Sequence, residues 1–207
     1  MVAIIDYGVG NLFSISRSFE FIGEKCVVTN DCKVISSASH IVLPGVGAFG
    51  DAMKKLTAAG LIPTLDECVS NGIPFLGVCL GMQLLYEKSY EYGTHDGLGY
   101  LKGEIYPIQP DLVDMNISLK IPHMGWNSLK ILDKNNCLMR NTKEGEYVYF
   151  VHSFYAKNCS ESIVATTEYG VEVPAVTACG NVFGCQFHPE KSGKCGLGIL
   201  SAFAELS

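Results

Sequence analysis

A cysteine flanked by glycines at residues 77–81 has the residue types of a catalytic nucleophile. These residues read Gly-Val-Cys-Leu-Gly, after an apolar run from Ile73 to Val78 and before apolar residues at helical spacing. The pattern predicts a strand that turns sharply into a helix, with glycines leaving room for a strained corner at Cys79. Such a turn would expose the thiol at a helix N-terminus, where the thiolate and an oxyanion are both stabilised. A buried structural cysteine is the alternative interpretation of the motif taken alone.

A second candidate group, Phe187-His188-Pro189-Glu190, supplies a base and a residue that could orient it. Pro189 restricts His188 to extended backbone, and residues two apart in an extended segment point to the same side. Glu190 could then hold one imidazole nitrogen while the other faces the nucleophile. Alone, the motif is also compatible with a surface turn. Together with an elbow cysteine, it predicts a Cys-His-Glu triad of Cys79, His188 and Glu190.

Two glycine-containing loops follow predicted strands near the N-terminus. The loop Pro44-Gly45-Val46-Gly47 exposes several backbone N–H groups that could receive an oxyanion, although an ordinary turn has the same composition. The Gly8-x-Gly10 loop resembles a dinucleotide-binding turn, but Phe13 stands where the third glycine belongs. We therefore interpret the Gly8 loop as a tight turn between a strand and a helix.

The first half of the chain predicts an alternation of strands and helices. Buried strands at Val2–Ile5, His40–Leu43 and Ile73–Val78 are each followed by apolar residues at helical spacing, over about 12–22, 49–59 and from Met82. Another short helix is expected over 61–69. This order is typical of an α/β, doubly wound three-layer fold with a mainly parallel mixed central sheet.

The second half predicts shorter strands in an antiparallel or mixed arrangement. The expected strands are 105–108, 117–121, 147–155, 163–167, 173–179 and 182–187, after a loop over 92–99. Gly180-Asn181 is a two-residue hairpin signal between the last two strands. A final helix is expected from Gly196 to Leu206. No linker or repeat interrupts the sequence, so we expect one domain over residues 1–207.

Composition limits the classes of partner and compartment. The chain has 207 residues, of which 48% are hydrophobic, with a net charge of −6 and no run of Lys or Arg. Nucleic acid and an anionic membrane surface are therefore unexpected partners. Nine cysteines show no regular framework, which favours reduced thiols in a cytoplasmic protein, and Met1 leads directly into a predicted strand. The five histidines show no metal-ligand spacing, so we expect neither a metal nor a cofactor.

Taken together, these motifs resemble the class I (triad) glutamine amidotransferases. Within that family the similarity is to the glutaminase subunits of imidazole glycerol phosphate synthases, and it spans essentially the whole chain. Besides the two triad motifs and the Pro44 loop, it rests on the segments Asp6–Asn11, Pro122–Asn127, Phe150–Ser153 and Lys191–Ser192.

The resemblance implies roles for the triad. Cys79 would attack the carboxamide of L-glutamine to form a thioester, and His188 would move the proton to the departing ammonia. Glu190 would orient the imidazole of His188.

The resemblance also implies a binding set around the triad. The oxyanion would be held by the backbone N–H of Leu80 and by one N–H of the loop Gly45-Val46-Gly47. Gln83 and Gly47 would contact the amino-acid end of glutamine, as would the backbone at Ser153 and Phe154. Phe154 stands where a tyrosine is expected, which matters only if a hydroxyl is needed there.

The implied partner is a cyclase subunit with a (β/α)8-barrel fold, which would receive the ammonia through a channel and make imidazole glycerol phosphate and AICAR in histidine biosynthesis. The Pro44–Gly47 loop, Trp126 and Lys191 would face this partner, whereas a core tryptophan and a solvated lysine are the alternatives. A cysteine peptidase on a similar elbow and a catalytically silent module also remain open. A paralogous barrel that aminates another substrate would leave this chain nearly unchanged.

Overall fold

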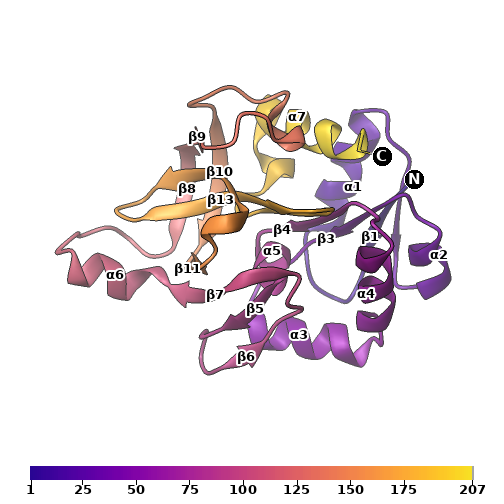
Figure 1. The fold of residues 1–207 in the computed structure, drawn as a ribbon, viewed down its shortest axis with the longest axis horizontal. Coiled ribbons are helices and arrows are strands. Elements are labelled where there is room, and N and C mark those ends of the chain that lie inside the picture. The colour runs from indigo at the N-terminus through magenta and orange to yellow at the C-terminus, as the bar shows by residue number, and fades with distance from the viewer. Residues whose placement is uncertain (207) are drawn as a thin grey trace.

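The computed structural model describes residues 1–206, and its largest element is a mixed sheet of eight strands in the order β2-β1-β3-β4-β14-β13-β12-β9 (Figure 1). The five strands from β2 to β14 run parallel to one another, and the remaining three pair antiparallel. Their bounds are β1 Val2–Ile5, β2 Cys26–Thr29, β3 His40–Leu43, β4 Phe75–Val78, β9 Lys130–Ile131, β12 Ile163–Glu168, β13 Glu172–Cys179 and β14 Val182–Cys185. The predicted doubly wound α/β fold with a mainly parallel mixed sheet is therefore confirmed.

Helices cover both faces of this sheet, as strands buried on both sides require. One apolar core contains side chains of α1 (Leu12–Phe21) and α7 (Gly193–Ala204), including Phe19 and Phe203. The other core contains side chains of α2 (Cys32–Ser36), α3 (Phe49–Ala58) and α4 (Ile62–Ser70), including Leu56 and Leu65. These two cores and the sheet between them make the three predicted layers.

Two smaller sheets lie beside the main sheet. A four-stranded sheet has the order β11-β7-β5-β6, and a two-stranded sheet pairs β10 with β8. Their bounds are β5 Tyr86–Ser89, β6 His95–Asp96, β7 Leu101–Pro107, β8 His123–Ser128, β10 Tyr147–His152 and β11 Phe154–Lys157. Helix α6 (Ile108–Asp114) follows β7 and projects away from the main sheet (Figure 1). The short helix α5 (Leu80–Leu84) follows β4 directly.

Several local predictions for the second half are wrong. Residues 117–120 have no regular structure where a strand was expected, and the predicted strand 105–108 ends at Pro107 because Ile108 begins α6. The single strand expected over 147–155 is interrupted at Ser153, so β10 and β11 join different sheets. The loop expected over 92–99 contains the two-residue strand β6. The hairpin at Gly180-Asn181 is confirmed by antiparallel pairing of β13 with β14.

No helix within residues 1–206 is long and apolar enough to cross a lipid bilayer. All nine cysteines in this described part of the chain are free thiols.

Candidate active site

Cys79 occupies the predicted elbow between β4 and α5. Its backbone has φ 54° and ψ −112°, in a region that is strained for a residue with a side chain. The glycines have a steric reason: a Cβ on Gly81 would lie 1.8 Å from the carbonyl oxygen of Leu43, and one on Gly77 would lie 2.7 Å from the carbonyl oxygen of Gly81. The glycine spacing therefore allows β3, β4 and α5 to pack closely around the thiol.

The predicted base and its orienter are in contact. Oε1 of Glu190 lies 2.8 Å from Nδ1 of His188, and both side chains are almost completely buried. This contact places Nε2 on the far side of the ring. Burial lowers the pKa of His188, but the Cys79 thiolate and the Glu190 carboxylate outweigh it and raise that pKa to about 9. The neighbouring Cys79 and Glu190 therefore favour the protonated form of the His188 imidazole.

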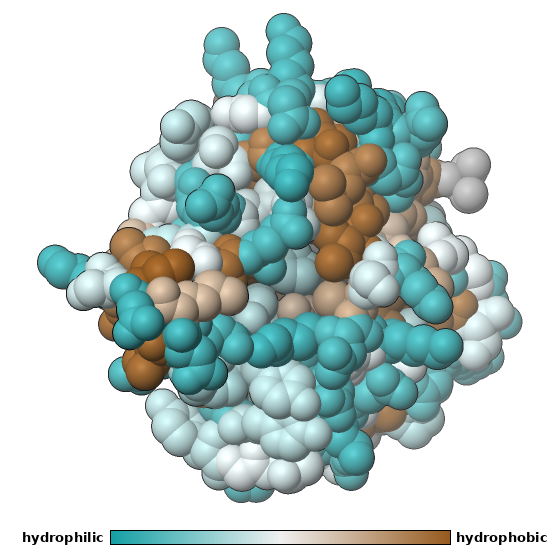
Figure 2. Space-filling view, turned by 60° about the vertical axis from the view of Figure 1, so that its left-hand side comes forward, coloured by the Kyte–Doolittle hydropathy of each residue, from teal (hydrophilic) through white to brown (hydrophobic). Residues whose placement is uncertain are grey.

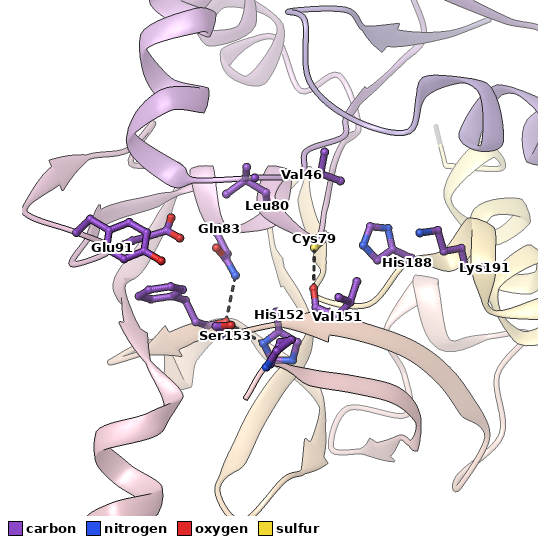
Figure 3. A pocket seen from close by; sticks show the side chains of 14 residues that line it. Val46, Cys79, Leu80, Gln83, Glu91, Val151, His152, Ser153, His188 and Lys191 are labelled. Atoms are coloured by element: carbon purple, nitrogen blue, oxygen red, sulfur yellow. Dashed lines mark hydrogen bonds between the residues drawn. The ribbon is translucent and has the colours of Figure 1, made fainter. Parts of the chain in front are cut away.

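A pocket of about 410 Å³ opens in front of these groups (Figure 3). Of the predicted site residues, those in its lining are Val46, Gly47, Cys79, Leu80, Gln83, Ser153, Phe154, His188 and Lys191. Glu190 lies behind His188 and outside the lining. In the view of Figure 3, Gln83 and Glu91 lie on one side of Cys79, whereas His188 and Lys191 lie on the other.

The loop Pro44–Gly47 is held by contacts at its Pro44 end, whereas its Gly47 end has free space beside the backbone. The hydroxyl of Tyr7 donates to the carbonyl of Pro44 over 2.7 Å. A Cβ on Gly45 would lie 2.7 Å from the backbone nitrogen of Gly81, so Gly45 packs against the elbow and does not line the pocket. Gly47 has φ 94° and open space where a Cβ would stand.

Gln83 is held in one amide orientation. Its Nε2 donates to the carbonyl oxygen of Phe154, 3.1 Å away, and to Oε1 of Gln186, 3.0 Å away. Both amide protons are thereby used, and within residues 1–206 Oε1 of Gln83 has no donor of its own. That oxygen is left to accept a hydrogen bond from a molecule in the pocket. Phe154 contributes its backbone oxygen to this arrangement, so the departure from tyrosine leaves the contact intact.

Five lining residues were not predicted from the sequence: Glu91, Tyr92, Pro122, Val151 and His152. Glu91 is buried, and a carboxylate oxygen accepts from the backbone N–H of Phe49 at the start of α3. Burial raises the pKa of Glu91, and the Phe49 contact opposes that shift. Among the described residues, Glu91 is the one acidic side chain in the lining. It lies in the loop after β5 without a local motif, so no sequence signal distinguishes it.

A buried histidine pair supports the pocket wall. Nδ1 of His152 contacts the carbonyl oxygen of Phe154 at 2.8 Å, and Nε2 of His152 contacts Nδ1 of His123 at 2.9 Å. Burial lowers the pKa of His123 to about 4 and, together with the neighbouring His123, that of His152 to about 3. Both rings are therefore neutral, which lets one donate to the other. Within residues 1–206, no group of three or more His, Cys, Asp or Glu side chains could hold a metal ion.

Of the predicted partner-facing residues, Trp126 and Lys191 are exposed, and Lys191 also lines the pocket. Trp126 on β8 is 56% exposed and lies outside the pocket lining, so the alternative of a core tryptophan is wrong. Its ring meets Tyr149 edge-on, with the ring centroids 6.2 Å apart. Nζ of Lys191 lies 5.9 Å from the centroid of the same tyrosine ring. Figure 2 shows that apolar side chains gather in separate patches on one face of the molecule, divided by polar ones.

Comparison with known proteins agrees with this fold. Residues 3–203 match the family described as glutamine amidotransferase class-I. A solved structure titled as a glutamine amidotransferase superposes with a TM-score of 0.74 over 98% of this chain and 99% of that chain, at 16% sequence identity. The chain belongs to the class I glutamine amidotransferase family.

Within this family, full-length relatives share a more specific name. The chain is 47% identical to the imidazole glycerol phosphate synthase subunit HisH of Caldanaerobacter subterraneus subsp. tengcongensis, over 100% of this chain and 98% of that one. It is 48% identical to the subunit of the same name from Aquifex aeolicus, over 97% and 94% of the two chains. The chain is thus similar to HisH subunits along its whole length.

Proposed function

We propose that this chain is the glutaminase subunit of an imidazole glycerol phosphate synthase. It would hydrolyse L-glutamine to glutamate and ammonia in the cytoplasm, and the ammonia would pass through a channel to a (β/α)8-barrel cyclase in histidine biosynthesis. The observation that carries the proposal is the triad geometry. Glu190 contacts His188, and His188 lines the same pocket as the elbow thiol of Cys79. Gln83 and Glu91 line that pocket as well.

The first chemical step would use the thiolate of Cys79. It attacks the carboxamide carbon of glutamine, a C–S bond forms, and the carbonyl oxygen becomes an oxyanion. The N–H of Leu80 and an N–H of the Gly45–Gly47 loop are the proposed oxyanion donors. The imidazolium of His188 then gives its proton to the leaving nitrogen, so that ammonia departs and a thioester remains.

The second step would return the enzyme to its resting state. His188, again neutral, takes a proton from water, whose oxygen attacks the thioester carbon. The C–S bond breaks, and the new carboxyl group gives the second proton of the water to solvent as glutamate is released. The proton taken by His188 re-forms the imidazolium beside the Cys79 thiolate. Glu190 stabilises the imidazolium throughout.

Substrate orientation would depend on the opposite end of the pocket. The free Oε1 of Gln83 and the carboxylate of Glu91 are two acceptors that fit the α-ammonium group of glutamine. A peptide substrate lacks that free ammonium at an internal residue. This end of the pocket therefore favours free glutamine over a peptide.

Regulation would act on the loop between Pro44 and Gly47. Tyr7 and the packing of Gly45 fix one end of the loop, whereas the open space at Gly47 lets the peptide linking Val46 to Gly47 rotate. Docking of the barrel against this loop, Trp126 and Lys191 would turn an N–H toward the oxyanion.

The proposed function is tested by co-purifying the chain with its barrel partner and measuring glutamate release. Glutamine should be hydrolysed by the complex, whereas asparagine and internal glutamine in a peptide should not. The ammonia should appear in the product of the barrel when its phosphorylated substrate is supplied. A complex that hydrolyses peptides equally well, or that releases no glutamate, would contradict the proposal.

A further inference from the structure

Gln186 is a buried amide next to the nucleophile, and none of the chemical steps described above uses it. It follows β14 and precedes His188 by two residues. It is 1% exposed, and its backbone N–H donates to the carbonyl of Ala175 over 2.9 Å. An amide side chain loses its hydration when it is buried, so it must be hydrogen-bonded there or destabilise the fold. The partners of this side chain therefore indicate why an amide is present.

Those partners belong to the candidate active site. Oε1 of Gln186 accepts from Nε2 of Gln83 over 3.0 Å, and Nε2 of Gln186 donates to Sγ of Cys79 over 3.9 Å. One side chain thus connects the residue expected to bind the substrate with the residue expected to attack it. The two contacts also fix the orientation of the Gln186 amide, because only the oxygen can accept and only the nitrogen can donate.

We propose that Gln186 is a positioning residue of this site, which locks the amide of Gln83 and donates a hydrogen bond to the thiolate of Cys79. A donor favours the anionic form of its acceptor, so the contact stabilises the thiolate more than the thiol. The lock keeps Oε1 of Gln83, and not its NH₂ group, directed into the pocket. The second effect concerns glutamine and so rests on the proposed function, whereas the first does not.

The test uses Gln186→Met, which keeps the length and volume of the side chain but removes both polar contacts. Iodoacetamide alkylation of Cys79 is followed by mass spectrometry of its peptide across a range of pH, because other cysteines are exposed. Loss of the donor should lower the alkylation rate at pH 7 by about tenfold and shift the rate profile to higher pH. The rate at the high-pH plateau should be unchanged.

Other titratable or charged groups surround the thiol and stay in place in this variant. They are His188 with Glu190 after β14, His152 at the end of β10, Tyr7 after β1, and Glu91 and Lys191 in the pocket lining. The matched control is Thr177→Val on the neighbouring strand β13. Within residues 1–206 its buried hydroxyl forms no hydrogen bond with Cys79, Gln83 or Gln186, so the change perturbs nearby packing but leaves the two contacts of Gln186 in place. The alkylation profile of this control should superimpose on that of the wild type.

Glutamine protection separates the two effects. With glutamine present, half-protection of Cys79 in Gln186→Met should need about tenfold more glutamine, because the amide of Gln83 keeps only its contact with the Phe154 carbonyl and is held less firmly. Gln83→Met, which removes the proposed substrate contact itself, should lose protection by glutamine. If glutamine does not protect the wild type, the proposed function fails, while the profile still tests the donor.

If the alkylation rate of Cys79 has the same pH profile in Gln186→Met as in the wild type, the proposed hydrogen bond to Cys79 is wrong. If the glutamine concentration for half-protection is unchanged, Gln186 does not orient the amide of Gln83. If Gln186→Met does not fold, Gln186→Asn provides the same test. It keeps a buried amide but shortens its reach by one methylene, so the same two shifts are expected.

Discussion

Oε1 of Glu190 lies 2.8 Å from Nδ1 of His188, and the two side chains are 1% and 3% exposed. The pair comes from neighbouring positions in one short segment, so the orientation of the imidazole is set locally. Its burial excludes the water that would otherwise compete for the contact. The structure therefore links the direction of the His188 ring to one carboxylate, which also contributes, with Cys79, to its raised pKa.

Replacing Glu190 with Gln should slow thioester formation by on the order of a hundredfold or more, because orientation and charge stabilisation of His188 are lost while nucleophile and base remain. Rapid-quench measurements on the complex should show the slower step with glutamine affinity close to unchanged. An unaltered rate would mean that Glu190 does not orient the base.

Replacing Cys79 with Ala should abolish glutamine hydrolysis, because it removes the proposed nucleophile and no neighbouring group can replace a thiolate. The complex should still form its product from added ammonium, since the proposed synthase chemistry lies on the partner. Assaying both reactions on the same preparation provides the control for folding. Loss of the ammonium-driven reaction would contradict this division of labour.

The same variant makes a prediction about pH. The pKa of His188 is about 9 because the Cys79 thiolate and Glu190 outweigh the lowering effect of burial. In Cys79→Ala the thiolate is absent while burial persists, so the pKa of His188 should fall, and the ring should lose its proton at a lower pH. Nitrogen-detected NMR titration of the imidazole measures this shift. His40, whose pKa is lowered mainly by burial, is an internal control that should not move.

The isolated chain should bind glutamine but hydrolyse it slowly. One missing oxyanion donor costs on the order of a hundred- to a thousand-fold in rate, which is enough to produce an off state with the triad intact. Steady-state rates should be compared for the chain alone, with its partner, and with partner plus an acceptor analogue. Equal rates in all three would exclude the loop switch.

Replacing Trp126 with Ala should weaken binding of the barrel partner by roughly 30-fold or more, because exposed tryptophans at the centre of an interface are common hot spots. Lys191→Ala should also weaken binding, since within residues 1–206 its ammonium forms no ion pair and is left for a partner carboxylate. Isothermal titration calorimetry measures both effects. Leu132→Ala, at an exposed apolar position outside the predicted surface, is the matched control. Equal affinities for all three variants would place the interface elsewhere.

Local sequence determined the elbow that carries Cys79 and the contact between His188 and Glu190. The glycines around Cys79 predict the elbow because only residues without a Cβ allow the close approach to Leu43 and Met82 that the structure shows. His188 and Glu190 are two residues apart, so their contact needs no long-range folding. The alternation of buried strands and helices likewise predicts β1, β3 and β4 of the parallel part of the sheet, because each unit depends on its own hydrophobic periodicity.

Tertiary structure decided what lies across the pocket and where the later strands pair. Glu91 becomes a pocket residue only because its loop reaches the start of α3, and Gln186 meets Gln83 from a distant part of the chain. Residues 117–120 have strand-like composition but no partner strand, whereas β8 forms because β10 supplies its hydrogen bonds. Strand pairing and pocket contacts join residues far apart in sequence, so their geometry depends on the packed fold and not on local pattern.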